Sequence, residues 1–281
     1  MNKLLIFIFF VNFVFISKAI FATTCPGNSS NTCGQALVYK VTMTKIELCT
    51  GRGSGTGKYD TTCEGSVTVG SGNYTVDIAS VSAGADVGAF VSTSGLPIGS
   101  TFKYVKPTFK KTFVIKGAVY INDNITCVTD ENATIGSNTK YETIMAGKKC
   151  SSTGSESSVI SSCQGEATNQ TYHMFTSGSV EVCRTASTNT CASSQTQTWN
   201  YNLPDDSSNY GTSFEKTGSS SEVTSMIYEL GSPYTVGVNA PKITIAFGVK
   251  TGLEAGNDPD GDNNGCYIGP YYPKVNISVT D

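Results

Sequence analysis

Residues 37–48 read LVYKVTMTKIEL, and their apolar and polar side chains alternate as they do in a half-buried β-strand. The apolar face takes every second residue up to Met43 and then shifts by one position to Ile46 and Leu48. Because neighbouring side chains of a strand point to opposite faces, such a shift would turn the apolar face outward. One extra residue absorbed near Thr44-Lys45 restores the pattern, so the sequence predicts a β-bulge there.

The same two-residue period continues through most of the chain. It predicts strands near residues 74–78, 101–105, 108–121, 243–249 and 275–279. Pro107 separates the second and third of these, and Leu96-Pro97-Ile98-Gly99 is a turn signal. We find no convincing amphipathic helix after residue 22, so we expect an all-β fold, a β-sandwich.

The alternation weakens between residues 123 and 232, where Ser, Thr and Asn are abundant. This segment holds five of the ten cysteines. A segment with so little apolar surface needs covalent support to stay ordered. We therefore predict a β-sandwich formed by residues 23–122 and 233–281, with residues 123–232 as a disulfide-rich, loop-rich β insertion or subdomain.

Residues 1–22 have the layout of a secretory signal peptide. Lys3 is followed by an almost wholly apolar run over residues 4–16, and cleavage is expected after Ala22. The alternative is a membrane anchor, but the apolar run is shorter than the ~20 residues that span a bilayer. We therefore predict a protein that is secreted, located at the cell surface or periplasmic, with no membrane span after cleavage.

All ten cysteines follow the predicted cleavage site, which favours five disulfides in an oxidising compartment. They are Cys25, Cys33, Cys49, Cys63, Cys127, Cys150, Cys163, Cys183, Cys191 and Cys266. The connectivity is open, because ten cysteines allow roughly 945 pairings. Pairing neighbours across Gly/Ser/Thr-rich stretches predicts Cys25–Cys33, Cys49–Cys63, Cys150–Cys163 and Cys183–Cys191, and leaves Cys127 for Cys266.

The charge balance argues against nucleic acid as a partner. Only 15% of residues are charged, and the net charge is −3. Removal of Lys3 and Lys18 with the signal peptide leaves 17 basic residues against 22 acidic ones. Nucleic-acid binding requires clustered positive charge, so the expected partners are copies of the chain itself or a surface glycan.

Several of these strands resemble a family of uncharacterised bacterial secreted and lipoprotein β-sandwich domains. The similar segments are Val41–Leu48, Val76–Val81, Leu96–Val105 and Ile243–Phe247, within residues 37–121 and 236–250. Phe102 stands where the family has a tyrosine, and the cysteine-rich middle is not part of the pattern. The resemblance implies an Ig-like or transthyretin-like β-sandwich outside a bacterial cell and no known activity. Fimbrial subunits have a similar, weaker likeness.

The stretch 257–265, NDPDGDNNG, is the best candidate for a metal site. Asp258, Asp260 and Asp262 at alternate positions, with oxygens of Asn264, provide the hard oxygen ligands that Ca²⁺ prefers. The spacing departs from that of an EF-hand, because Gly265 occupies the eighth loop position. The alternative is a polar hairpin loop, since Asp, Asn, Gly and Pro all favour turns.

No residue pattern indicates catalysis. His173 is the only histidine, and nothing near it resembles a nucleophile elbow. The lysines and aromatic residues between Phe102 and Lys116 form either a basic face for an acidic partner or a solvated strand face. We therefore predict a non-catalytic, exported structural or adhesive cell-surface protein, such as a filament subunit. A secreted glycan- or calcium-binding module and a secreted hydrolase are the alternatives.

Overall fold

The computed structural model describes residues 23–25, 28–52, 62–80, 85–86, 95–133, 147–152, 154–176, 180–183, 197–199, 213–214, 223–239, 242–257, 266–271 and 274–280. Its strands are β1 (Thr23–Cys25), β2 (Asn28–Gly34), β3 (Ala36–Cys49), β4 (Gly51–Arg52), β5 (Cys63–Glu64), β6 (Val67–Asp77), β7 (Ala85–Asp86), β8 (Thr101–Lys110), β9 (Thr112–Asn122), β10 (Ile125–Val128), β11 (Lys148–Lys149), β12 (Gln170–Thr176), β13 (Val180–Cys183), β14 (Gln197–Trp199), β15 (Ser213–Phe214), β16 (Val223–Thr235), β17 (Lys242–Gly248), β18 (Leu253–Asn257), β19 (Cys266–Pro270) and β20 (Lys274–Thr280). The helix α2 covers Glu156–Glu166. The protein is therefore all-β, as the sequence predicts.

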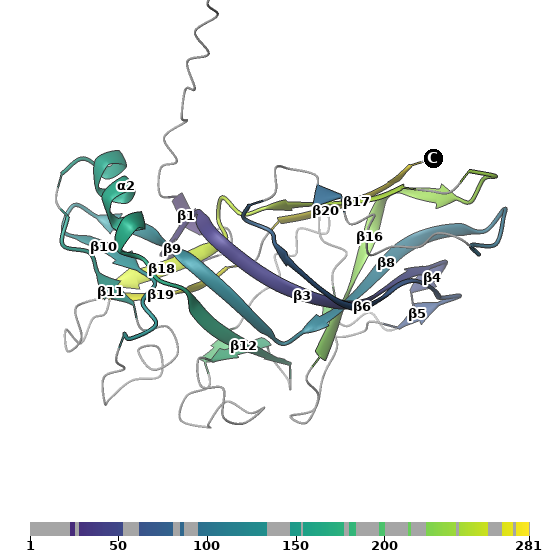
Figure 1. The fold of residues 1–281 in the computed structure, drawn as a ribbon, viewed down its shortest axis with the longest axis horizontal. Coiled ribbons are helices and arrows are strands. Elements are labelled where there is room, and N and C mark those ends of the chain that lie inside the picture. Colours follow the sequence, from purple (N-terminus) through teal and green to yellow (C-terminus); the bar gives the residue numbers. More distant parts are fainter. Residues whose placement is uncertain are drawn as a thin grey trace, which may run out of the picture.

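Strand β3 is the centre of an 11-stranded antiparallel sheet (Figure 1). Met43 pairs with Tyr74 of β6 on one edge and with Phe109 of β8 on the other. Lys40 likewise lies between Asp77 of β6 and Val114 of β9. Strands β8 and β9 therefore follow one another along the same edge of β3, and only Lys111 separates them.

The predicted break at Pro107 is wrong, because β8 runs through it without interruption. Pro107 pairs with Ile46 of β3. The ladder between β8 and β16 has pairs at Thr108 and at Val105 but none at the two residues between them. Proline has no N–H to donate, and its place in this gap means that no ladder hydrogen bond is lost.

The predicted β-bulge is confirmed. The register of β3 shifts between Met43 and Lys45 against both of its neighbours. Against β8 the extra residue is Thr44, whereas against β6 the extra residue lies on β6, between Ser71 and Tyr74. Ile46 and Leu48 are then fully buried, and Met43 is almost completely buried. Lys45 and Glu47 share the other face, where their side chains form an ion pair of 2.9 Å.

Strands from the predicted insertion belong to this large sheet. Strand β16 pairs with β8, and strands β12 and β10 pair with β9. All three lie on the edge that faces away from β3. The predicted boundary between residues 232 and 233 lies inside β16. Residues 123–232 therefore supply strands to the main sheet as well as loops, because short runs such as residues 170–173 pair with β9 even though their local pattern is weak.

A second layer covers one face of the large sheet. Strands β17 and β20 pair from Lys242↔Thr280 to Gly248↔Lys274, and β18 and β19 pair from Leu253↔Pro270 onward, with the register shifted by one residue. Strand β7 extends the first pair, and β2 and β1 extend the second. Leu253, Ala255 and Ile268 are fully buried in the core shared with the large sheet. The two layers form a β-sandwich, and its Ig-like or transthyretin-like character stays a prediction.

Four disulfides join the same cysteines as in the predicted pairing. They are Cys25–Cys33, Cys49–Cys63, Cys127–Cys266 and Cys150–Cys163. The third connects β10 of the large sheet to β19 of the second layer across 139 residues of sequence, so it fastens the two layers together. The fifth predicted pair, Cys183–Cys191, is not tested, because Cys191 lies outside the described residues.

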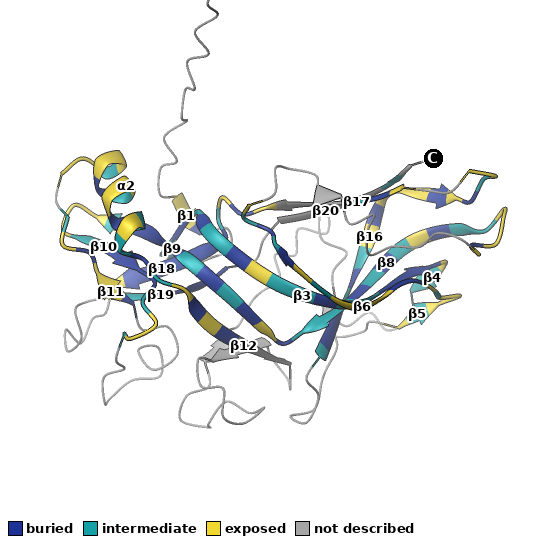
Figure 2. Ribbon diagram, in the orientation of Figure 1, coloured by how far each residue is buried: buried dark blue, intermediate teal, exposed yellow. Residues whose placement is uncertain are grey.

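Helix α2 contradicts the expectation that the chain has no helix. Only Val159 and Cys163, one turn apart, are buried, and the rest of α2 is mostly polar and largely exposed, apart from the half-buried Ile160 (Figure 2). Such a sequence has no apolar stripe wide enough to predict a helix. The Cys150–Cys163 disulfide and packing against Ala118 and Val128 of the large sheet hold it in place.

Candidate interaction site at the end of β8 and β16

The residues that precede β8 form a tight turn. Ser100 N–H donates to Pro97 O over 3.1 Å, and Gly99 has a φ of 83°. A positive φ at the third position is the requirement of a type II turn, and glycine meets it without strain. The turn signal in the sequence is therefore confirmed, and Ile98 occupies its apex.

The chain that follows β16 is hydrogen-bonded to this turn. Gly99 N–H donates to Val236 O, and Val236 N–H donates to Ser100 O, each over 2.9 Å. Thr101 and Thr235, the next pair along the two strands, share a side-chain hydrogen bond of 2.8 Å. These contacts hold the turn and residues 236–238 together as one rigid end.

Two aliphatic side chains project from this end. Ile98 is 73% exposed and Val238 is 88% exposed, and they are the exposed large hydrophobic residues of the described part of the chain. Their neighbours Leu96, Phe102 and Val236 are buried beneath them. We call Ile98 and Val238 the apolar tip. Single exposed aliphatic residues are ordinary. We take these two as a candidate contact surface because both lie within two residues of the hydrogen bonds that join Gly99 and Ser100 to Val236.

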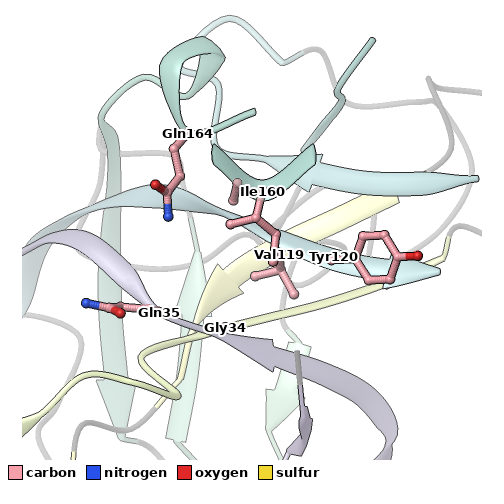
Figure 3. Close-up of a pocket in the computed structure, with 7 residues that line it drawn as sticks. Gly34, Gln35, Val119, Tyr120, Ile160 and Gln164 are labelled. Carbon is pink, nitrogen blue, oxygen red and sulfur yellow. The ribbon is translucent and has the colours of Figure 1, made fainter. Parts of the chain in front are cut away.

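A small pocket lies between helix α2 and the start of β3. It is lined by Gly34, Gln35, Ala118, Val119, Tyr120, Ile160 and Gln164. Ile160 of α2 lies beside Val119 of β9, and the amide ends of Gln35 and Gln164 lie to one side of them (Figure 3). The volume of about 30 Å³ holds one or two water molecules. Sites for small-molecule ligands have at least ~300 Å³, so this pocket is not a substrate site.

A buried carboxylate lies in the second layer, at Glu254 of β18. Only 4% of Glu254 is exposed, and Asn31 Nδ2 donates to its Oε2 over 3.3 Å. Tyr267 Oη in turn donates to Asn31 Oδ1 over 2.6 Å, so the three side chains connect strands β2, β18 and β19. Burial raises the pKa of Glu254 to about 7, although the hydrogen bond from Asn31 lowers it in part. The sequence did not single out this residue.

The predicted calcium loop is not tested. Asp258, Asp260, Asp262 and Asn264 lie outside the described residues, between β18 and β19. The flanking residues Asn257 and Cys266 pair with each other. Within the described ranges no group of three or more His, Cys, Asp and Glu side chains is placed to hold a metal ion. The calcium site therefore stays a prediction.

Two of the four aromatic residues between Phe102 and Lys116 belong to the core. Phe102 and Phe113 are buried, and Phe113 stacks between Tyr39 and Tyr172, at 5.8 Å and 6.0 Å between ring centroids. Lys111 is also buried, and its burial lowers its pKa. Tyr104 and Phe109 are half-buried and Lys103 is exposed. Phe102, Phe113 and Lys111 are therefore excluded from an open basic and aromatic face, and the other residues of the set are not.

His173 lies in strand β12, as expected for a structural residue, and pairs with Thr112 of β9. Helices long and apolar enough to cross a membrane are absent from the part of the chain that the structure describes. Comparison of the chain with protein-family models, with curated proteins and with solved structures found no match.

Proposed function

We propose that this chain is an exported, non-catalytic structural protein of the cell surface, and that it assembles with further copies of itself. The observation that carries the proposal is the apolar tip, where Ile98 and Val238 are exposed on a rigid, hydrogen-bonded end. A rigid apolar end loses little conformational entropy when another molecule covers it.

The argument for export combines the predicted signal peptide with the disulfides. Four disulfides within the described residues require an oxidising compartment to form and persist. A periplasmic, cell-surface or extracellular location satisfies that requirement. A structural role outside the cell also suits a fold whose two layers are covalently joined through Cys127 and Cys266.

The tip by itself is a weak contact. Covering two aliphatic side chains contributes roughly 3–5 kcal/mol, while association costs about 4–15 kcal/mol in lost translational and rotational freedom. Stable assembly therefore needs a second contact or many tips acting together, as in a filament.

The test compares the mature chain, residues 23–281, with the double variant Ile98→Ser/Val238→Ser. We expect the wild-type chain to form assemblies in analytical ultracentrifugation and negative-stain electron microscopy, and the double variant to form few or none. Thr75→Ser, at an exposed site on β6, is the control. Antibody labelling of intact cells tests the location.

Two results would contradict the proposal. One is a wild-type chain that stays monomeric up to millimolar concentration and is absent from the cell surface. The other is a double variant that assembles as the wild type does while both keep the same melting temperature.

A further inference from the structure

The first two strands form a hairpin with its own covalent closure. Strand β1 pairs with β2 from Thr23↔Cys33 onward, and the Cys25–Cys33 disulfide lies inside the hairpin. Both cysteines are almost completely buried, in a small cluster with Tyr271 that is separate from the main core. Because its closure is internal, the hairpin keeps its shape when it separates from the rest of the molecule.

Besides the cluster with Tyr271 and the contact of Gly34 with Val119 of β9, a short ladder holds the hairpin on strand β18. The ladder between β2 and β18 consists of three residue pairs, Leu253↔Gly34, Glu254↔Cys33 and Ala255↔Thr32. The side chain of Asn31 adds its hydrogen bonds with Glu254 and Tyr267. Elements with so few contacts open at a lower free-energy cost than the core.

A single residue connects the hairpin to the large sheet. Gln35 is the one residue between the end of β2 at Gly34 and the start of β3 at Ala36. From Ala36 onward the chain pairs with β9 of the large sheet. A change of backbone conformation at Gln35 therefore suffices to swing the hairpin away while β3 keeps its place.

The contact between β2 and β18 also buries an ionisable group, the carboxyl group of Glu254. Glu254 faces Cys33 of β2 and Gly269 of β19 in the ladder, and the described residues of β1 and β2 carry no charged side chain. From β19 and the residue after it, the titratable groups are Tyr267 and Tyr271. Strand β9, which also packs against β18, carries Lys116 and Tyr120. No ion pair of the described residues includes Glu254. When Glu254 ionises, the buried charge favours the open state, in which water reaches the carboxylate.

We propose that the β1–β2 hairpin is an exchangeable element, which leaves β18 of its own chain and pairs with β18 of a second copy. Exchange of an identical element re-forms every contact of the closed chain and adds only the new connection between the two molecules. This inference rests on the proposed self-assembly and supplies the second contact that the apolar tip requires. Ionisation of Glu254 speeds the exchange, because it favours the open state through which the hairpin passes.

The test uses two full mature chains that each carry one new thiol. Thr32→Cys is introduced into one chain and Ala255→Cys into an isotopically heavy chain. These positions face each other in the β2–β18 ladder, at a separation that suits a disulfide. After mixing at pH 8 and brief oxidation, mass spectrometry should find a light–heavy disulfide between positions 32 and 255.

Four control chains make the result specific. The doubly substituted chain should form the bond within one molecule, which shows that folding and geometry permit it. Replacing Ala255→Cys by Thr75→Cys, on the distant strand β6, should give no specific product. A Glu254→Gln background should slow formation of the mixed bond by roughly two orders of magnitude at pH 8, because the pKa of Glu254 is about 7 when buried and 4.5 when exposed. Glu229→Gln, an exposed glutamate of β16, should leave the yield unchanged.

Absence of the mixed bond while the doubly substituted chain closes on itself would overturn the exchange. Hydrogen exchange gives a readout without added thiols. The amides of β18 should exchange faster than those of β3, and Glu254→Gln should slow them; equal protection in β18 and β3 would also overturn the inference. If the chain assembles but the mixed disulfide does not form, the exchange is refuted and the proposed self-assembly is not. If the mixed disulfide forms but electron microscopy and ultracentrifugation find no larger assemblies, only the proposed function is refuted.

Discussion

Replacing Glu254 by glutamine should stabilise this protein at alkaline pH and leave its stability unchanged in acid. Glutamine keeps the shape of the side chain and an oxygen that accepts the hydrogen bond from Asn31, but it cannot ionise. The wild-type carboxyl group has a pKa of about 7 in the folded protein, raised from 4.5 by burial. The folded state therefore holds a proton that the unfolded state has lost between these two values.

The size and sign of the effect follow from proton linkage. Because the folded state binds more protons than the unfolded state, the free energy of unfolding falls as the pH rises from 4.5 to about 7. Each pH unit in this window contributes about 1.4 kcal/mol. The wild-type chain should therefore be about 3 kcal/mol less stable than Glu254→Gln at pH 8, and the two should be equally stable at pH 4.

Thermal unfolding of both chains with their disulfides intact measures the difference. At pH 8 the melting temperature of Glu254→Gln should be roughly 6–12 °C higher, since 1 kcal/mol corresponds to about 2–4 °C for a domain of this size. Glu229→Gln, which removes an exposed carboxylate, is the matched control and should change little. A difference between wild type and Glu254→Gln that stays constant from pH 4 to pH 8 would refute this reasoning.

Four further changes test the packing of the fold, each by chemical denaturation. Removing the bond between the layers with Cys127→Ala/Cys266→Ala should cost about 5 kcal/mol, because it releases a loop of 139 residues in the unfolded chain; a loss below about 1 kcal/mol would contradict this. Gly99→Ala should cost about 1–2 kcal/mol, since nothing lies within 4 Å of the added carbon but φ is positive. Gly165→Ala, equally uncrowded but inside helix α2, should instead stabilise by about 0.5–1 kcal/mol, and effects of equal sign at the two glycines would be inconsistent with the backbone geometry. Thr129→Val should cost about 1–3 kcal/mol, because the fully buried hydroxyl accepts from one backbone N–H and donates to a backbone C=O 2.7 Å away; a neutral effect would show that these groups find other partners.

The candidate site shows the limit of prediction from local patterns. The turn at Pro97–Ser100 was predictable, because proline and glycine restrict the backbone through their own chemistry. The apolar tip was not, because the exposure of Ile98 and Val238 depends on which segment pairs with the turn. Glu254 was missed for a related reason, since a charged residue between two apolar ones in a strand is expected to face water.

The sequence by itself determined the features that depend on neighbouring residues. The alternation around Met43 and Ile46 specified a strand with a bulge at Thr44, and closely spaced cysteines specified the short disulfide loops. Only the tertiary structure decided which strands continue one another past Lys111, that residues 156–166 form a helix, and that Glu254 is buried. Those outcomes depend on contacts between segments far apart in the chain, whose packing energy exceeds the local preferences of the residues involved.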